Sequence, residues 1–486
     1  MSLVDLVKSV NANCTVQSST FISCAGPVNV SNLANTTVNG AGVELQFTDL
    51  TAGNGGVTLT NANGAVLTNF TISWQSGGAR DPIVAGANRI QSLGNVAACP
   101  SGQAGGVLIL DLPLSGTQYL TAVSVWDNTR GWPWYQTAPA NFETYFATGT
   151  TAAFSNGQSG CIPGLAGFVG QRVLVRHVVC TNHAFHCLNC QNITVQNVTI
   201  FSAPGMGFVF ESGGSNISLI SNTIAPRCTP NCTAAEPSLT ADAAHFADLA
   251  GSILLDSNNF GWQGDDDLNI TGLVAPAVPA QNQSGSGWLQ VSASLESRLW
   301  TMTVGGSVSL YDAGLNALGV SKVLAVNPRA GLVQLSSLPA NTSNFVIART
   351  AGIPQNVVIR NNQFHDNRAR GILMGGSNAL VVNNQIERVT MEAVLVTADD
   401  SYWYEGPGAQ NVTIENNTIV SVNRFPASNL PDAISAGTSV PTTYSGSIGT
   451  PIQNLIVQGN SFTSLYTNPN TPVSIGSGAS GTNTQN

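Results

Sequence analysis

The nine residues Asn192-Ile-Thr-Val-Gln-Asn-Val-Thr-Ile200 decide how this chain folds, because approximate copies of them recur along it. The shared pattern is Asn-x-x-Val/Ile/Leu-x-Asn/Ser-Asn-x-Ile/Phe. Clear copies span Asn216–Ile224, Ser252–Phe260, Asn356–Phe364, Asn378–Ile386, Asn411–Ile419 and Asn454–Phe462, and weaker ones span Gly64–Ile72 and Arg172–Cys180. The starts at 192 and 216 differ by 24 residues and those at 356 and 378 by 22, and such a period is typical of a solenoid.

The residue types within each copy indicate which solenoid this is. Alternating apolar residues predict a short strand, and the Asn residues that follow tolerate left-handed backbone at a turn. Their side chains can also bond to the same Asn one coil away. We therefore predict an all-β fold, a right-handed parallel β-helix. A leucine-rich repeat is disfavoured because leucine periodicity and helix-forming segments are missing.

Two long stretches interrupt the repeat. Residues 271–350 contain short apolar runs separated by Gly, Asn and Pro, which predicts a small antiparallel barrel inserted into the solenoid. Residues 75–170 are Gly-rich, carry an aromatic cluster and are predicted to form a second β insertion; the cluster is Trp126, Trp132, Trp134 and Tyr135. The predicted division is 1–74 (N-terminal cap and first coils), 75–170 (insertion), 171–270 (coils with the acids), 271–350 (barrel), 351–470 (further coils) and 471–486 (flexible tail).

The composition limits which partners the protein can bind and indicates the compartment in which it acts. The net charge is −9, and only Lys8 and Lys322 are lysines, so a basic patch for nucleic acid or an anionic membrane is not expected. No apolar run reaches the ~18 residues of a membrane span. Nine cysteines, several closely spaced, and many Asn-x-Ser/Thr sites predict a secreted, disulfide-bonded glycoprotein; the opening residues show no secretory leader, which is compatible with its prior removal.

The chemistry concentrates between Thr240 and Thr271, which contains Asp242, Asp265, Asp266 and Asp267. In a chain with 8% charged residues, three consecutive acids repel one another and do little for folding, which indicates a catalytic site.

Aligning the strand that follows each repeat places Asp242, Asp266, Arg370 and Glu392 at equivalent positions. Equivalent positions on successive coils stack at ~4.8 Å, so these four should form one column on an outer face. Neighbouring carboxylates raise one another's pKa whereas Arg370 lowers those nearest it, so one acid can stay protonated while another is ionised.

Other polar residues are expected near this column. Asp265 follows Gly264 at a turn and can face the same side as the column, whereas Asp267 is expected to point inward or into a polar contact. His245 and Asn269 should stack on each other and orient substrate or an Asp. An exposed aromatic side chain suits the apolar face of a sugar and a carboxylate suits its hydroxyls. The remaining predicted substrate-binding residues are Arg368, Arg370, Glu392, Trp403 and Glu405.

Each feature has an alternative interpretation. The acids could instead bind calcium, which needs six to eight oxygens, and Arg370 with Glu392 could be only a stacked salt bridge. The segment Cys180-x2-His183-x2-His186-Cys187-x2-Cys190 is similar to a zinc cluster, although disulfides or stacked core cysteines are favoured there. We expect neither a metal nor another cofactor.

Four motifs resemble, in order and spacing, those of the family 110 glycoside hydrolases, the β-helical α-1,3-galactosidases. They are Asp242-Ala-Ala-His-Phe, Gln263-Gly-Asp-Asp-Asp-Leu-Asn, Asn367-Arg-Ala-Arg-Gly-Ile-Leu and Trp403-Tyr-Glu-Gly, within residues 170–465. The chain departs from the family at Ala243 (usually Gly), at Asp267 (usually Ala) and in lacking a Ser within the last motif. The resemblance implies an inverting exo-galactosidase acting on galactose-terminated glycans, with Asp265 as general acid and Asp242 with Asp266 activating water.

Two other functions stay open at this stage. A polygalacturonase-like hydrolase shares the β-helix and a Gly-Asp-Asp motif, but acidic substrates call for a more basic cleft than Arg368 and Arg370 provide. A non-catalytic carbohydrate-binding or calcium-stabilised solenoid is the second. Strand geometry separates Asp242 and Asp265 by ~6 Å, which favours inversion modestly over retention.

Overall fold

The computed structural model describes residues 1–10, 12–48, 56–74, 182–227, 238–281, 283–340, 342–422, 432–464 and 472–484 in full. Between residues 84 and 177 it describes the backbone of strands β7 to β13 alone.

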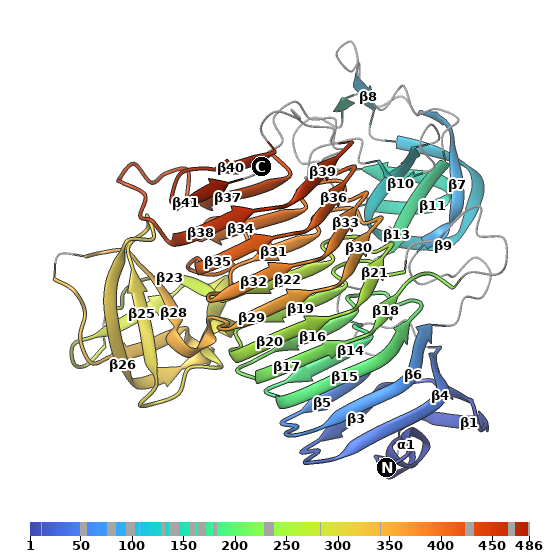
Figure 1. Cartoon of the computed structure of the whole chain (residues 1–486), viewed down its shortest axis with the longest axis horizontal. Coiled ribbons are helices and arrows are strands. Elements are labelled where there is room, and N and C mark those ends of the chain that lie inside the picture. The colour runs from blue at the N-terminus through green and yellow to red at the C-terminus, as the bar shows by residue number, and fades with distance from the viewer. Residues whose placement is uncertain are drawn as a thin grey trace.

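The fold is a parallel β-helix whose coils stack from the N-terminus to the C-terminus (Figure 1). One face is a ten-stranded parallel sheet. Its strands, in order, are β3 (Val28–Ser31), β5 (Val57–Thr60), β14 (Phe185–Leu188), β16 (Phe208–Glu211), β19 (Ala244–Ala247), β22 (Leu268–Thr271), β31 (Ile372–Met374), β34 (Val394–Asp399), β37 (Ile434–Ser439) and β40 (Val473–Ile475).

The other side of each coil belongs to an eighteen-stranded sheet that bends between strand pairs. Only β1 and β2 in this sheet pair antiparallel among the described strands. Its members are β1 (Cys14–Ser18), β2 (Phe21–Cys24), β4 (Thr37–Phe47), β6 (Val66–Trp74), β15 (Gln191–Ile200), β17 (Ser215–Ile220), β18 (Thr223–Ile224), β20 (Ala250–Asp256), β21 (Asn259–Gly261), β29 (Val357–Arg360), β30 (Gln363–His365), β32 (Ala379–Val382), β33 (Gln385–Glu387), β35 (Gln410–Glu415), β36 (Thr418–Val420), β38 (Ile452–Gln458), β39 (Ser461–Thr463) and β41 (Ala479–Thr484).

The asparagines of the repeat do two separate jobs. The first Asn of a copy is left-handed, with φ of 54° at Asn192 and 55° at Asn356, and so turns the chain into its strand. The Asn at the seventh position is buried instead. Its side-chain amide donates to the same Asn one coil on, at 2.8–3.0 Å, and this ladder runs through Asn222, Asn258, Asn362, Asn384, Asn417 and Asn460. The predicted Asn stacking is confirmed.

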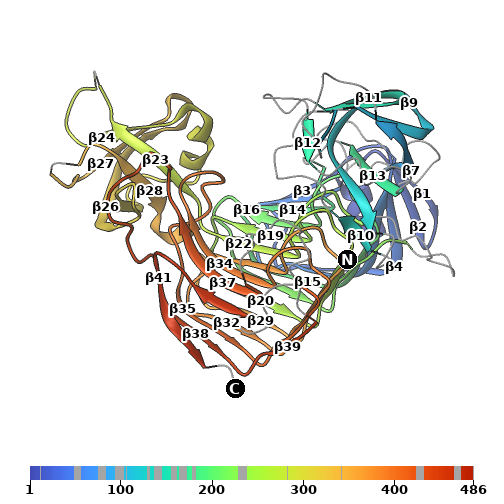
Figure 2. The ribbon, with the colours of Figure 1, turned by 90° about the horizontal axis from the view of Figure 1, so that it is seen from above.

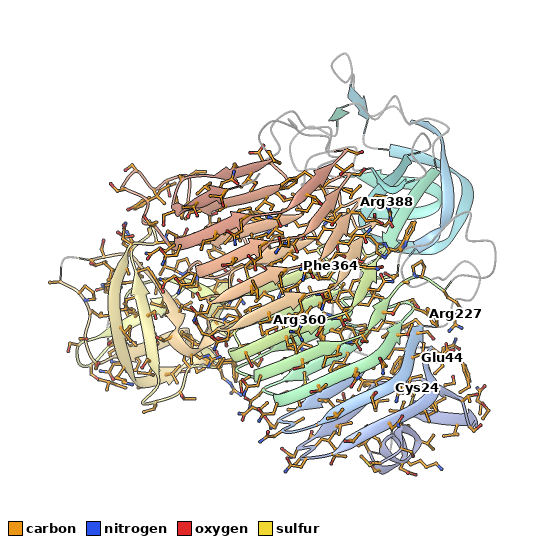
Figure 3. All side chains as sticks on the ribbon, viewed as in Figure 1. Cys24, Glu44, Arg227, Arg360, Phe364 and Arg388 are labelled. Atoms are coloured by element: carbon orange, nitrogen blue, oxygen red, sulfur yellow. A yellow bond between two sulfur atoms is a disulfide. The ribbon has the colours of Figure 1, made fainter. Side chains whose placement is uncertain are left out.

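The apolar positions of the repeat fill the inside of the coils. Ile193, Val195 and Ile200 are all buried, and the final Phe of the copies at 252 and 356 stack with ring centroids 6.0 Å apart. On the outside of the same sheet, Arg360 and Arg388 bind carboxylates rather than packing (Figure 3). The predicted β-helix is therefore built as the periodicity indicates, with apolar residues inside and charges outside.

The N-terminal end of the stack is covered. Helix α1 (Leu3–Ser9) places Leu3, Leu6 and Val7 in the main core, which closes the first coil; the cap was predicted but its helix was not. Cys14 and Cys24 form a disulfide beside it. At the other end the structure differs from the expected flexible tail, because β40 and β41 pair in parallel with β37 and β38. Backbone hydrogen bonding to an exposed coil edge explains this order despite the low hydrophobicity of the segment.

The insertion after β22 is a closed six-stranded barrel, as predicted (Figure 1). The predicted apolar runs around Trp288, Val308, Val323, Leu332 and Phe345 form strands β24 to β28, whereas β23 was not predicted, because Pro276 interrupts its apolar pattern. The strands are β23 (Val274–Pro279), β24 (Trp288–Val291), β25 (Ser307–Tyr311), β26 (Ala317–Asn327), β27 (Leu332–Leu335) and β28 (Phe345–Arg349), with 3₁₀ turns η2 (Ala293–Leu299), η3 (Pro328–Ala330) and η4 (Thr350–Gly352).

The earlier insertion contains an antiparallel sheet. It is formed by β7 (Val84–Leu93), β9 (Val107–Asp127), β10 (Trp132–Tyr135), β11 (Tyr145–Phe154) and β13 (Arg172–His177), and β8 (Gln103–Gly105) pairs with β12 (Cys161–Pro163). The weak repeat copy at Arg172–Cys180 is therefore wrong, since β13 pairs antiparallel with β7 and β9 and lacks the Asn residues that turn a coil. The side chains of the aromatic cluster lie outside the described residues. Figure 2 shows this sheet and the barrel on opposite sides of the face that carries β14, β16, β19 and β22.

Candidate active site

The predicted column exists, and the strand register creates it. Ala244 pairs with Leu268, Leu268 with Ile372, and Ile372 with Val394. Two residues before each of these positions lie the four members of the column, Asp242, Asp266, Arg370 and Glu392. Backbone hydrogen bonds of 2.9–3.0 Å hold these turns together, and the barrel leaves the stack between Asp266 and Arg370 without disturbing it.

Three carboxylates converge at this column. One oxygen from each of Asp242, Asp265 and Asp266 lies within 4.8 Å of the others. Asp242 and Asp266 are 5% and 3% exposed, whereas the Asp265 side chain is 38% exposed and lies 3.1 Å from the Arg368 guanidinium. Asp265 thus lies on the same side of the coils as Asp242 and Asp266. It is the one of the three acids that solvent or a ligand can reach.

Asp242 is held by a histidine and a backbone amide. Its Oδ2 lies 2.8 Å from His245 Nδ1, and its Oδ1 accepts a 3.2 Å hydrogen bond from the Asp266 N–H. Burial raises the pKa of Asp242 above the ordinary range, although the hydrogen bond from His245 opposes this rise. Burial lowers the pKa of His245, but contact with Asp242 outweighs it and the net shift is upward. The contact between the two groups thus favours the charged form of each, whereas burial of Asp242 opposes its charged form and prevails for that carboxyl.

Asp266 is held by arginine. Its Oδ1 accepts a 2.8 Å hydrogen bond from the Arg370 N–H, and its Oδ2 lies 3.4 Å from Nη1 of the same residue. Burial raises the pKa of Asp266 well above its usual range, and the Arg370 charge offsets part of that rise. Arg370 Nε also lies 3.6 Å from Glu392 Oε2, so one guanidinium serves two buried carboxyls.

The surroundings of Asp267 indicate a structural role, as expected from the alternation of side chains along a strand. It is fully buried, and the amides of Gln263 and Asn367 both donate to its carboxyl. Burial raises its pKa well above the usual range, and the hydrogen bond from Gln263 opposes that rise.

A loop from the C-terminal coils completes the site. Glu405 Oε1 accepts a 3.2 Å hydrogen bond from the Asn269 amide, and Asn269 stacks beside His245 as predicted. The Asp399 carboxylate binds the N–H groups of residues 401–403 and so fixes the loop, leaving Trp403 61% exposed. Burial raises the pKa of Glu405.

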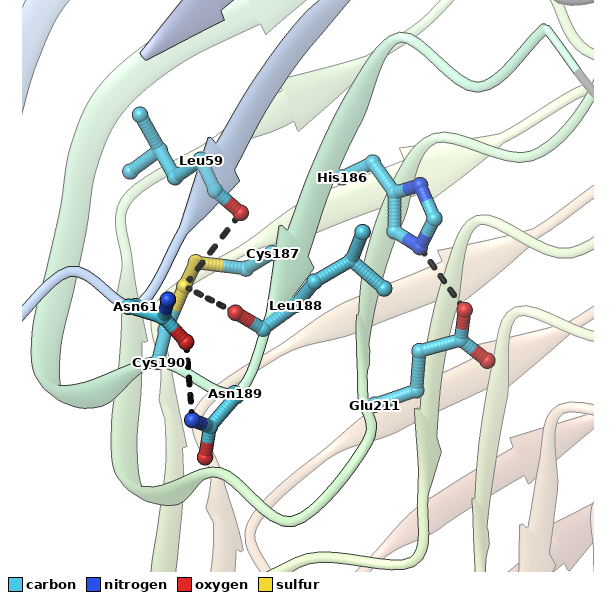
Figure 4. Close-up of a disulfide and its surroundings, with 8 residues drawn as sticks. All are labelled: Leu59, Asn61, His186, Cys187, Leu188, Asn189, Cys190 and Glu211. Atoms are coloured by element: carbon cyan, nitrogen blue, oxygen red, sulfur yellow. Dashed lines mark hydrogen bonds and ion pairs between the residues drawn. A yellow bond between two sulfur atoms is a disulfide. The ribbon is translucent and has the colours of Figure 1, made fainter. Parts of the chain in front are cut away.

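Sequence reasoning missed several neighbours. The register continues the column to Asp432, because Val394 pairs with Ile434. On the coils before Asp242, His186 Nε2 lies 2.9 Å from Glu211 Oε1 (Figure 4). Burial, assisted by His186, lowers the pKa of His183 to about 4. Arg298, from the barrel turn η2, interacts electrostatically with Glu405 and Glu211, and no repeat signal pointed to it.

The alternatives involving metals can be placed on the structure. Cys187 and Cys190 form a disulfide, so they are not a thiolate pair for zinc (Figure 4); Cys180, Cys228 and Cys232 lie outside the described residues. Within the described ranges, Asp242, Asp265 and Asp266 are the one group of three or more such side chains whose oxygens approach closely enough to share a cation. Arg368, Arg370 and His245 each lie beside one of these carboxyls.

The carboxyl oxygens of the three acids lie close together. One oxygen from each acid is within 4.8 Å of the others, which is shorter than the ~6.5–9.5 Å between carboxyls that is usual for inverting glycosidases. The ~6 Å expected from strand geometry refers to backbone positions and does not include the side chains.

Fold and site together define a parallel β-helix protein with an acid cluster on one outer face. A family model described as a right-handed beta helix region matches residues 336–486. The chain is 26% identical to alpha-1,3-galactosidase A of Shewanella woodyi over 266 residues, which cover 54% of this chain and 43% of that one. It is 23% identical to alpha-1,3-galactosidase B of Bacteroides thetaiotaomicron over 254 residues, 51% of this chain and 40% of that one. The resemblance drawn from the motifs is thus confirmed, over about two fifths of the relatives' length.

Solved structures are more distant. The catalytic domain of a GH87 alpha-1,3-glucanase in complex with nigerose superposes with a TM-score of 0.41 at 12% identity, covering 92% of this chain and 49% of that one. An endo-xylogalacturonan hydrolase from Aspergillus tubingensis gives 0.36 at 8% identity, covering 95% and 86%. None of the helices in the described part of the chain has the length and apolar character that a membrane crossing requires.

Proposed function

We propose that this protein is a glycoside hydrolase that removes terminal α-1,3-linked galactose from glycans by exo attack with inversion, and that it acts outside the cell. The observation that carries the proposal is the convergence of Asp242, Asp265 and Asp266 within 4.8 Å in unlike surroundings. The named relatives and the motifs support galactose, the linkage and the exo mode. The two disulfides support an oxidising compartment.

Exposure supports Asp265 as the general acid. Asp265 is the accessible member of the three, so its carboxyl can reach the glycosidic oxygen and donate a proton to the leaving group. Arg368 at 3.1 Å keeps that carboxyl oriented and can stabilise the carboxylate that remains after proton transfer.

The two buried acids suit water activation. The contact with His245 favours the ionised form of Asp242 and so supports it as the base, and Asp266, held by Arg370, can orient the same water. The resemblance supports inversion, whereas the short oxygen separation by itself favours retention. Three carboxyls rather than two allow a pair to hold water while the third protonates the leaving group.

Trp403, Glu405 and Asn269 suit recognition of the sugar. An exposed indole offers a flat apolar face to a pyranose ring, and the half-buried Glu405 carboxyl and the buried Asn269 amide offer hydrogen bonds to its hydroxyls.

The test combines two measurements. Hydrolysis of nitrophenyl α-galactoside and of polygalacturonate should be assayed with and without chelator; we expect cleavage of the galactoside only, unaffected by chelation. Proton NMR of early turnover should show β-galactose first. Initial α-galactose would mean retention, and release from polygalacturonate alone would overturn the galactosidase proposal.

A further inference from the structure

A second pocket lies where the barrel meets the β-helix, away from the acid column. It has a volume of about 680 Å³, within the size range of small-molecule sites. Strands β23, β24 and β28 and the loop 441–444 form its walls, which are mostly apolar, and Asp400 contributes to its lining. None of its lining residues belongs to the column.

Asp400 is the unexplained group in this pocket. It is 1% exposed, and neither carboxyl oxygen has a hydrogen-bond partner among the described residues. The two acids nearest to Asp400, in contrast, have hydrogen-bond partners. Asp399 accepts hydrogen bonds from N–H groups of the Trp403 loop, and Asp312 accepts them from the N–H groups of Gly314 and Asn316. Buried polar groups in folded proteins have partners, so the missing partner of Asp400 points to a ligand that enters the pocket.

We propose that this pocket is a second, non-catalytic binding site for a neutral sugar unit, with Asp400 bonding its hydroxyl groups. The apolar walls, including Val278 and Tyr444, suit the C–H face of a pyranose. At the rim, Asn344 and Thr443 can each donate and accept hydrogen bonds.

The charge of the site selects against other ligand classes. No lysine or arginine lines the pocket, and Asp312, Asp399 and Asp400 disfavour an anion. Burial, followed by repulsion from Asp399, raises the pKa of Asp400 to about 7. Below neutral pH the carboxyl is therefore neutral and can both donate and accept, which suits a diol better than an ammonium ion.

A pocket-filling variant tests the site. Ala293→Trp places an indole at the exposed rim, and Ser294→Trp is the matched control, since Ser294 is also exposed but does not line the pocket. Each is combined with Asp265→Asn to suppress turnover, and binding of methyl α-galactoside and methyl α-glucoside is measured by saturation-transfer NMR and titration at pH 6.

We expect two galactoside sites in the Asp265→Asn protein and in the Ser294→Trp variant, and one in the Ala293→Trp variant. Asp400→Ala should weaken the second site about tenfold without loss of folding, because it removes an unpaired buried acid. Equal stoichiometry in all proteins would overturn the proposal, as would binding of tetramethylammonium that Asp400→Asn abolishes. Failure of the catalytic proposal would show instead as no galactoside hydrolysis by the wild type, with the pocket variants still differing in binding.

Discussion

His245→Asn tests whether the histidine tunes the catalytic base. His245 Nδ1 lies 2.8 Å from Asp242 Oδ2, and a hydrogen bond to a charged group stabilises by roughly 1.5–3 kcal/mol. At 1.36 kcal/mol for each pKa unit, its loss should raise the pKa of Asp242 by about one to two units. A base must be deprotonated to act, so the acidic limb of the kcat/KM profile should move to higher pH by that amount.

The assay is a pH–rate profile on nitrophenyl α-galactoside. We expect activity at acidic pH to fall about 10- to 100-fold in the variant and to recover partly as the pH rises above the new limb. The chain offers a matched control in His365→Asn, because His365 Nδ1 lies at the same 2.8 Å from Asp366 Oδ2 but on β30 of the other sheet. An unmoved limb in the His245 variant, or an equal shift in both variants, would refute the reasoning.

Three further predictions follow from the geometry. Asp265→Asn should abolish hydrolysis of substrates with poor leaving groups but keep part of the activity on activated aryl galactosides, which steady-state kinetics on both would show; equal losses would contradict the acid assignment. Asn384→Ala removes four hydrogen bonds of the buried ladder, to Asn362, Ile359 and Asn417. It should lower the free energy of unfolding, measured with denaturant, by about 4 kcal/mol. The control Asn383→Gly should leave that free energy nearly unchanged, because glycine readily adopts the φ of 56° found there. Trp403→Ala should raise KM for galactosides several-fold, while Trp300→Ala, equally exposed on the barrel, should leave it unchanged.

The column was predictable because a β-helix converts sequence period into spatial stacking. Once the repeats are aligned, the coils between Asp242 and Glu392 have one register, and an insertion of any length can leave and re-enter it. The same logic fails at Asp432, since the loop carrying Trp403 and Glu405 lengthens that coil to 40 residues from Glu392 to Asp432. Because the coils differ in length, the repeat pattern does not identify Asp432 as a member of the column, whereas the backbone pairing does.

Contacts from the barrel could not be predicted by any repeat. Arg349 Nε lies 2.9 Å from Asp248 Oδ1, across the junction between the barrel and the coils, and Arg298 is placed near the acids by the docking of η2. Such positions depend on how the barrel and the coils meet. Asp400 is of the same kind, because it lines one pocket together with residues of the barrel strands β23, β24 and β28.

The strand register alone does not determine the distance between the carboxyl groups. Pairing determines that Asp242 and Asp266 are one coil apart, and it gives ~4.8 Å between their backbones. It does not determine the direction of the Asp265 side chain, which leaves the chain at a turn rather than in a strand. There Arg368 contacts the Asp265 carboxylate at 3.1 Å, and an oxygen of that carboxylate lies within 4.8 Å of the neighbouring acids. Because inversion and retention differ by only a few ångströms in carboxyl separation, the stereochemical outcome rests on a turn that the repeat pattern does not describe.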